Sequence, residues 1–132
     1  MQRLSWDLLR QSWVDEFFFE PLSDFILRLH EDRGAETLAV AVFSPEGEDV
    51  PPASPPVDVL VLYRNPVDFL KDNLFLREHD PSGMLNFFSY GIDSFKRMVE
   101  GANPLSIQAL KTGLIVFEID NAMEDFVSSG ES

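Results

Sequence analysis

The hydrophobic positions of this chain fall into two kinds of pattern. Near-continuous apolar runs occupy residues 38–43 and 57–63, and turn-forming residues bound both of them. Runs of this length are typical of strands that are buried on both faces in an α/β core. A less continuous apolar segment at residues 84–90 and a short apolar run at 114–117 predict a third and a fourth strand.

The other segments follow a helical spacing. Leu9, Trp13 and Phe17 recur at every fourth position, which predicts a helix over residues 5–19. We expect Pro21 to end this helix, because proline lacks a backbone N–H group. Further helices are predicted over residues 22–31, 66–78, 94–100 and 104–110.

Residues near the helix ends support these assignments. Asp93 and Asn103 are the expected N-caps of the last two helices, because their side-chain oxygens can accept hydrogen bonds from free backbone N–H groups. Pro66 is expected in the first turn of the helix over 66–78. His30 and His79 fall near predicted helix ends, where the helix dipole favours a cation. We therefore interpret both histidines as structural and not as members of a Ser–His–acid site.

The predicted order is helix, helix, strand, loop, strand, helix, strand, helix, helix, strand. Residues 44–56 form the loop, because five prolines exclude both a helix and a central strand there. This order indicates an α/β (α+β) domain, a small mixed sheet of about four strands with helices packed on it. The aromatic block Phe17–Phe19 is either extra core packing or a surface for a partner.

Composition limits the classes of protein that remain. At 132 residues and 45% hydrophobic, the chain is long enough for one core and too short for two. It contains no cysteine, which excludes disulfides and thiolate metal sites. We predict no membrane span, because no apolar run reaches about 20 residues. Without a signal-peptide pattern at the N-terminus, the expected compartment is the cytoplasm.

The net charge of −13 argues against direct nucleic-acid binding, because phosphate contacts need clustered lysine and arginine. A self-repelling surface explains the acidity most simply. A basic partner protein and a cytoplasm of high salt concentration are the alternatives.

Asp58 is the candidate catalytic and metal-binding residue, since it stands inside the apolar run 57–63. A buried carboxylate needs a partner, a metal ion or a solvated strand end. Metal-dependent phosphoryl or nucleotidyl transfer usually needs two convergent carboxylates. Residues two positions away on a strand share its face, and these are Pro56 and Leu60. No Gly-rich phosphate loop is present either.

Segments 43–45, 56–61, 95–101, 103–105 and 109–118 follow one another along the chain in a distinctive order. Together they resemble the minimal nucleotidyltransferases of the DNA polymerase beta superfamily. Phe43-Ser44-Pro45 stands where that family has a Phe-Gly-Ser turn, and 56–61 where it has Ser-Asp-hydrophobic-Asp and a strand. Segments 95–101, 103–105 and 109–118 resemble the family's closing helices and strand. The resemblance implies a nucleotidyltransferase-like domain over 21–118, an N-terminal helical extension over 1–20 and a C-terminal tail over 119–132.

The same resemblance implies roles for two residues and exposes three departures. Ser44 corresponds to the turn that approaches the nucleotide, and Asp58 to a magnesium-binding catalytic aspartate. Pro45, however, replaces the family's serine, and Pro56 replaces its first aspartate. The third strand offers Asn86 where the family commonly has another carboxylate. We therefore predict a domain that has lost catalysis, uses no cofactor and binds a small helical protein or a nucleotide.

Two alternatives stay open at this point. The domain could be an active magnesium-dependent nucleotidyltransferase in which a loop carboxylate joins Asp58; the candidates are Glu46, Glu48 and Asp49. It could instead be an acidic α/β homodimer whose interface consists of Trp6, Trp13 and Phe17–Phe19.

Overall fold

The computed structural model describes residues 1–4, 6–44, 50 and 52–127. The elements are, in chain order, β1 (Gln2–Arg3), α1 (Trp6–Trp13), α2 (Phe19–Arg33), β2 (Thr37–Phe43), β3 (Val57–Tyr63), α3 (Phe69–Glu78), β4 (Leu85–Gly91), α4 (Ile92–Glu100), α5 (Pro104–Thr112), β5 (Leu114–Glu118) and the 3-10 turn η1 (Glu124–Phe126). The predicted mixed α/β class is confirmed, and so is the predicted order from α1 to β5.

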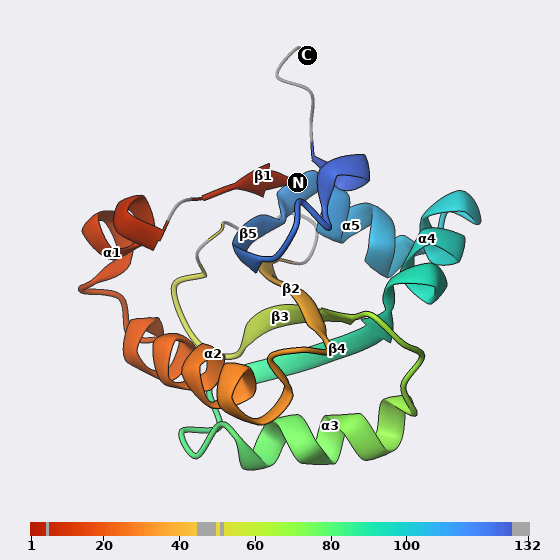
Figure 1. Ribbon diagram of the computed structural model, residues 1–132. Helices are drawn as coiled ribbons and strands as arrows, with labels where there is room; N and C mark the ends of the chain where they lie inside the picture. The colour runs from red at the N-terminus through yellow and green to blue at the C-terminus, as the bar shows by residue number, and fades with distance from the viewer. Residues whose placement is uncertain (5, 45–49, 51, 128–132) are drawn as a thin grey trace.

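The strands form one mixed sheet in the order β1-β5-β2-β3-β4. β2 runs antiparallel to both β3 and β5, whereas β3 and β4 run parallel. Figure 1 shows the sheet at the centre of the molecule with helices around it. None of the described helices is long and apolar enough to cross a membrane.

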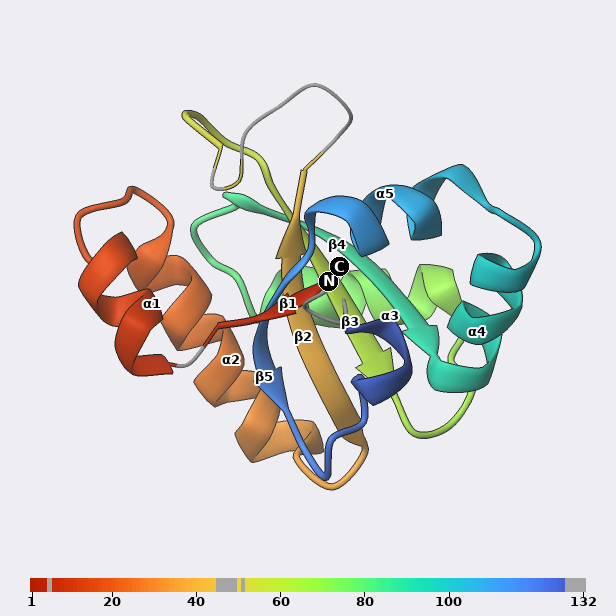
Figure 2. The ribbon, with the colours of Figure 1, turned by 90° about the horizontal axis from the view of Figure 1, so that it is seen from above.

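The two central strands are buried on both faces, as their apolar runs predict. Every residue of β2 is buried, and so is every residue of β3 except the half-buried Asp58. α1, α2 and α3 cover one face through a core that includes Val40, Val59 and Phe87. α4, α5 and η1 cover the other face, and α1 and α2 lie across the sheet from α4 and α5 (Figure 2).

The predicted helix over residues 5–19 is wrong at its C-terminal end. α1 stops at Trp13, the chain turns, and α2 begins at Phe19. The turn lets Trp13 and Phe18 both enter the core, where their rings meet edge to face at 5.3 Å. Phe18 is fully buried, so core packing is confirmed for it, and neither ring is available for an interface. Pro21 lies in the first turn of α2, where its missing N–H is not needed.

The N-terminal ends of α3, α4 and α5 can each be compared with the residue that the sequence predicts there. α3 begins at Phe69 and not at Pro66, and Asp68 is its N-cap, because the Asp68 carboxylate accepts a hydrogen bond from the Lys71 backbone N–H at 3.1 Å. Asp93 lies inside the first turn of α4 and does not cap it. Asn103 is confirmed as the N-cap of α5, accepting from the Leu105 N–H at 2.9 Å. The sheet also gains β1, which is too short to show an alternating pattern.

A buried charge pair joins α2 to α3. The Arg33 guanidinium donates to the almost fully buried carboxylate of Asp72, and it lies 3.5 Å from the ring centroid of Phe75. It also lies 3.3 Å from the Tyr63 hydroxyl. Burial, together with the nearby Asp72, raises the pKa of Tyr63, so its phenol stays neutral. The pair therefore ties both helices to the end of β3.

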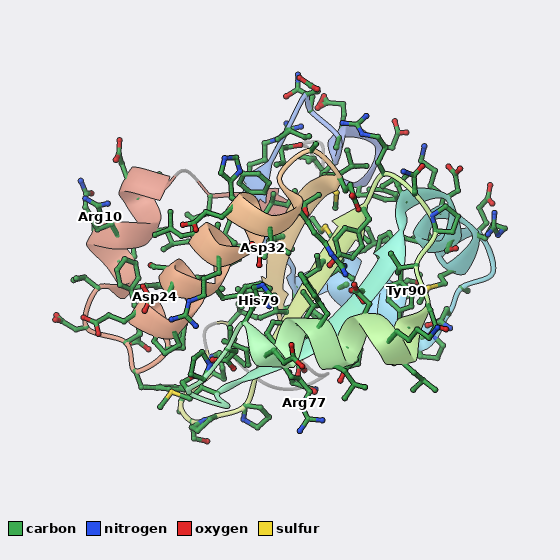
Figure 3. The ribbon with its side chains drawn as sticks, turned by 60° about the horizontal axis from the view of Figure 1, so that its bottom comes forward. Arg10, Asp24, Asp32, Arg77, His79 and Tyr90 are labelled. Carbon is green, nitrogen blue, oxygen red and sulfur yellow. The ribbon has the colours of Figure 1, made fainter. Side chains whose placement is uncertain are left out.

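A second contact between α2 and α3 is more exposed. His79 ends α3, and its ring contacts the Asp32 carboxylate near the end of α2 (Figure 3). The other ring nitrogen lies 2.8 Å from the Phe75 carbonyl oxygen. His30 also lies in the last turn of its helix, so both histidines occupy the predicted helix ends.

We expect Asp72→Asn to lower the free energy of unfolding by about 3 kcal/mol, because Arg33 would lose the countercharge for its partly buried guanidinium. Asp32→Asn is the matched control. Its carboxylate is 55% exposed, so the loss should stay below about 1 kcal/mol. Urea unfolding followed by circular dichroism measures both changes, and equal losses in the two variants would contradict the assignment.

Candidate functional site

The candidate site lies where three strand ends meet. The antiparallel register places the last residue of β2, Phe43, opposite Asp58 of β3. The parallel register then places Asn86 of β4 on the other side of Asp58. These three residues form one cross-strand row, and side chains in such a row share a face of the sheet.

Asp58 and Asn86 are hydrogen-bonded. The Asn86 side-chain amide donates to a carboxylate oxygen of Asp58 at 3.1 Å. A half-buried carboxylate needs a hydrogen-bond donor, and the Asn86 amide supplies one. An amide carries no negative charge, so the row lacks the paired carboxylates that attract a divalent cation.

Ser44 follows Phe43 directly and is held by α5. Its backbone N–H donates to the Thr112 hydroxyl oxygen at 3.1 Å, and its carbonyl accepts from the Gln108 amide at 3.1 Å. The Thr112 hydroxyl also lies 3.2 Å from that carbonyl. Ser44 is buried, and its backbone is fixed to the helix. The contact between Ser44 and a nucleotide, which the resemblance implies, stays a prediction.

A cleft of about 740 Å³ lies beside this row. Its lining comes from the residue before β3, from α3, from the turn before β4, and from β4 itself: Pro56, Asn73, Leu74, Arg77, Glu78, Asp80, Gly83, Leu85, Asn86 and Phe87. Asp80 is buried and accepts from the Leu85 N–H at 3.0 Å, so it holds the turn in place. Arg77 supplies a cation from α3, and Figure 3 shows its side chain extending away from that helix. The volume suits a small molecule.

Of the residues in the metal-binding prediction, the structure describes Asp58 but not the loop carboxylates. Asp58 lies in the row described above, with Pro56 exposed at the edge of the cleft. Pro45 and the loop carboxylates Glu46, Glu48 and Asp49 lie outside the described residues. Among the residues that the structure places, no cluster of three acidic, histidine or cysteine side chains could hold a metal ion.

Comparisons with known proteins add a partial likeness. No protein-family model matches the chain, and no curated protein matches it. A solved structure that resembles it is the crystal structure of the toxin–antitoxin pair MntA–HepT, with 15% sequence identity and a TM-score of 0.47. The match covers 76% of this chain and 74% of that one. A likeness of this degree assigns no residue role and no activity.

Sequence reasoning missed the side chains that complete the site. Gln108 and Thr112 lie one turn apart on α5, and their spacing marks a polar strip on one helix face. The sequence alone could have identified this polar strip. It could not have shown that the strip binds the Ser44 backbone. Arg77 carries no local signal at all, because only the packing of α3 beside β4 brings it to the cleft.

We predict that Asn86→Asp creates a divalent-cation site. The variant would place two carboxylates about 3 Å apart, so it should be less stable than the parent at neutral pH. The deficit should shrink at acid pH, because protonating one carboxyl removes the repulsion. Added Mn²⁺ should raise the melting temperature of the variant, since it binds only the folded state.

The double variant Asp58→Asn with Asn86→Asp is the control. It keeps one carboxylate and one amide in the row, so Mn²⁺ should leave its melting temperature unchanged. An equal rise in the parent protein would contradict the proposed geometry.

Proposed function

We propose that the protein is a nucleotidyltransferase-like domain that lacks nucleotidyl transfer and acts by binding another protein. The hydrogen bond between Asp58 and Asn86 is the observation that carries this proposal. Where the family would hold a metal ion between carboxylates, this chain pairs its carboxylate with an amide donor. Pro56 and Asn86 stand where the family has carboxylates, and a magnesium site with fewer carboxylates holds the ion weakly and positions it poorly.

The scaffold around this pair supports the family part of the proposal. Asp58 is the second residue of β3, an inner strand of the sheet that follows the loop after β2. The helices α4 and α5 and the strand β5 then close the chain in the order that the resemblance implies. The division at residues 20 and 118 remains part of this proposal.

Exposed apolar side chains support the binding part. Val14 beside α1 and Leu27 on α2 line one shared groove and are 53% and 61% exposed, and Leu8 on α1 is 54% exposed. Clustered apolar surface on a folded domain commonly marks a protein interface. The acidic surface favours a basic partner through charge complementarity.

A nucleotide in the cleft is the second candidate. Arg77 and the amide of Asn86 line this cleft, and an arginine can pair with a phosphate group. Nucleotide binding that is lost in Arg77→Ala and kept in Lys71→Ala would favour this function over protein binding. Lys71 is a suitable control because it is an exposed cation on the same helix.

We expect no transfer of label when the protein is incubated with Mg²⁺ and radiolabelled nucleoside triphosphates, alone or with a candidate partner. The reason is that Pro56 and Asn86 stand where the family has metal-binding carboxylates. Asp58→Asn is the control, and it should behave as the parent protein does. Metal-dependent labelling that Asp58→Asn abolishes would contradict the proposal and favour an active enzyme that uses Glu46, Glu48 or Asp49.

A further inference from the structure

An apolar groove of about 610 Å³ lies between α1, α2 and β5. We call it the α1–α2 groove. Its apolar lining consists of Val14, Phe19, Ile26, Leu27, Val116 and Phe117. None of these residues belongs to the row of Phe43, Asp58 and Asn86 or to the cleft beside it. The groove is therefore a separate feature of the molecule.

The groove is open to solvent on its helical side. Val14 is 53% exposed and Leu27 is 61% exposed, whereas the neighbouring Trp13 and Phe18 are buried in the core. Ser23 also lines the groove, and its buried hydroxyl has no hydrogen-bond partner among the described residues. Water thus covers an apolar surface that a binding partner could cover more favourably.

The wall that α2 contributes has the shape of a helix-packing surface. Phe19, Ser23, Ile26 and Leu27 stand at positions i, i+4, i+7 and i+8, which form one stripe along a helix. Such stripes present ridges and grooves into which the side chains of another helix fit. The geometry favours a helix as the occupant.

Acidic side chains border this stripe. Glu20, Asp24 and Glu31 are exposed and lie on the side of α2 next to Leu27, by helical periodicity. Figure 3 shows Asp24 on α2 and Arg10 on the neighbouring α1. Arg10 lines the groove as well and Arg28 follows Leu27 on α2, but the carboxylates of Glu20, Asp24 and Glu31 outnumber these two cations. The border is therefore acidic, and it favours positive charge on the occupant.

Charge and composition argue against two other occupants of the groove, a second copy of the chain and another segment of the same chain. A second copy would bring the same acidic border and a net charge of −13 against the first. Segments 45–49 and 128–132 of this chain contain no large apolar side chain that could fill the groove. These observations favour an occupant from another protein.

We infer that the α1–α2 groove binds an amphipathic helix of a partner protein, with its apolar stripe in the groove and lysine or arginine side chains along the acidic border. This inference rests on the proposed function, because it names the surface and the chemistry through which the domain binds a protein. Apolar burial supplies the affinity, and the charges select and orient the helix.

The test uses a fluorescent synthetic peptide with leucines at helical i, i+3, i+4 spacing and lysines elsewhere. A peptide of the same composition in scrambled order is its control. Fluorescence anisotropy measures the affinity of each peptide for the full chain. We expect the amphipathic peptide to bind more tightly than the scrambled one, and its binding to weaken as salt rises.

Two groove variants and one matched variant locate the binding. Leu27→Asp and Val14→Asp should each weaken binding about tenfold to a hundredfold, because each removes an apolar contact and adds a charge. Leu70→Asp adds the same charge at a leucine that is 75% exposed on α3, outside the groove, and it should bind as the parent does. The substituted residues are exposed, so circular dichroism should show all three variants folded.

Other outcomes overturn the inference. If Leu27→Asp and Leu70→Asp bound the amphipathic peptide equally tightly, the peptide would bind outside the groove. If the parent protein bound both peptides equally tightly, charge alone would explain the binding. Asp58→Asn should bind the amphipathic peptide as the parent does. Loss of catalysis and binding at the groove are thus tested separately, since label transfer would refute the first without changing the peptide result.

Discussion

The burial of β2 and β3 on both faces is the constraint on which the rest of the structure depends. Two adjacent strands that are apolar throughout must be covered on both sides, so helices pack on each face of the sheet. The interior of this sheet therefore leaves little room for charge. Polar chemistry is confined to the strand ends, and Asp58 stands at such an end. The place of the candidate site follows from this constraint.

At that strand end, the partner of the carboxylate decides what chemistry is available. A second carboxylate would build up the negative charge that a divalent ion neutralises. Asn86 instead donates a hydrogen bond to Asp58, which stabilises the carboxylate without a metal ion. The nearby Ser44 backbone is likewise held by α5. We propose that this site now holds the strand ends together, and that the protein binds its partner at the α1–α2 groove in the opposite helical layer.

Local sequence patterns predicted the helices and strands whose ends are set by neighbouring residues in the chain. The bounds of β3 agree with the sequence prediction because a continuous apolar run ends at turn-forming residues on both sides. The break between α1 and α2 was missed, because Trp13 and Phe17 keep a helical spacing across a turn that only the packing of Phe18 explains. β1 consists of two residues and owes its strand to pairing with β5.

The candidate site could be predicted only in part, for a similar reason. The sequence marks Asp58 as unusual and Asn86 as a departure from the pattern of the nucleotidyltransferases that it resembles. It does not show that the two side chains touch, because the parallel pairing of β3 and β4 is a long-range contact. The α1–α2 groove was missed altogether. Its wall joins residues of α2 to Val116 and Phe117, which lie about 90 positions further along the chain.

The central claim is that Asp58 and Asn86 form a hydrogen-bonded pair that holds no metal ion. Titration of the isotope-labelled protein with paramagnetic Mn²⁺, followed by nuclear magnetic resonance, tests it most directly. A bound Mn²⁺ broadens the signals of nearby nuclei. Our account predicts that the Asn86 side-chain amide and the backbone amides of Val57–Val59 keep their signals at substoichiometric Mn²⁺. Selective loss of those signals would contradict it.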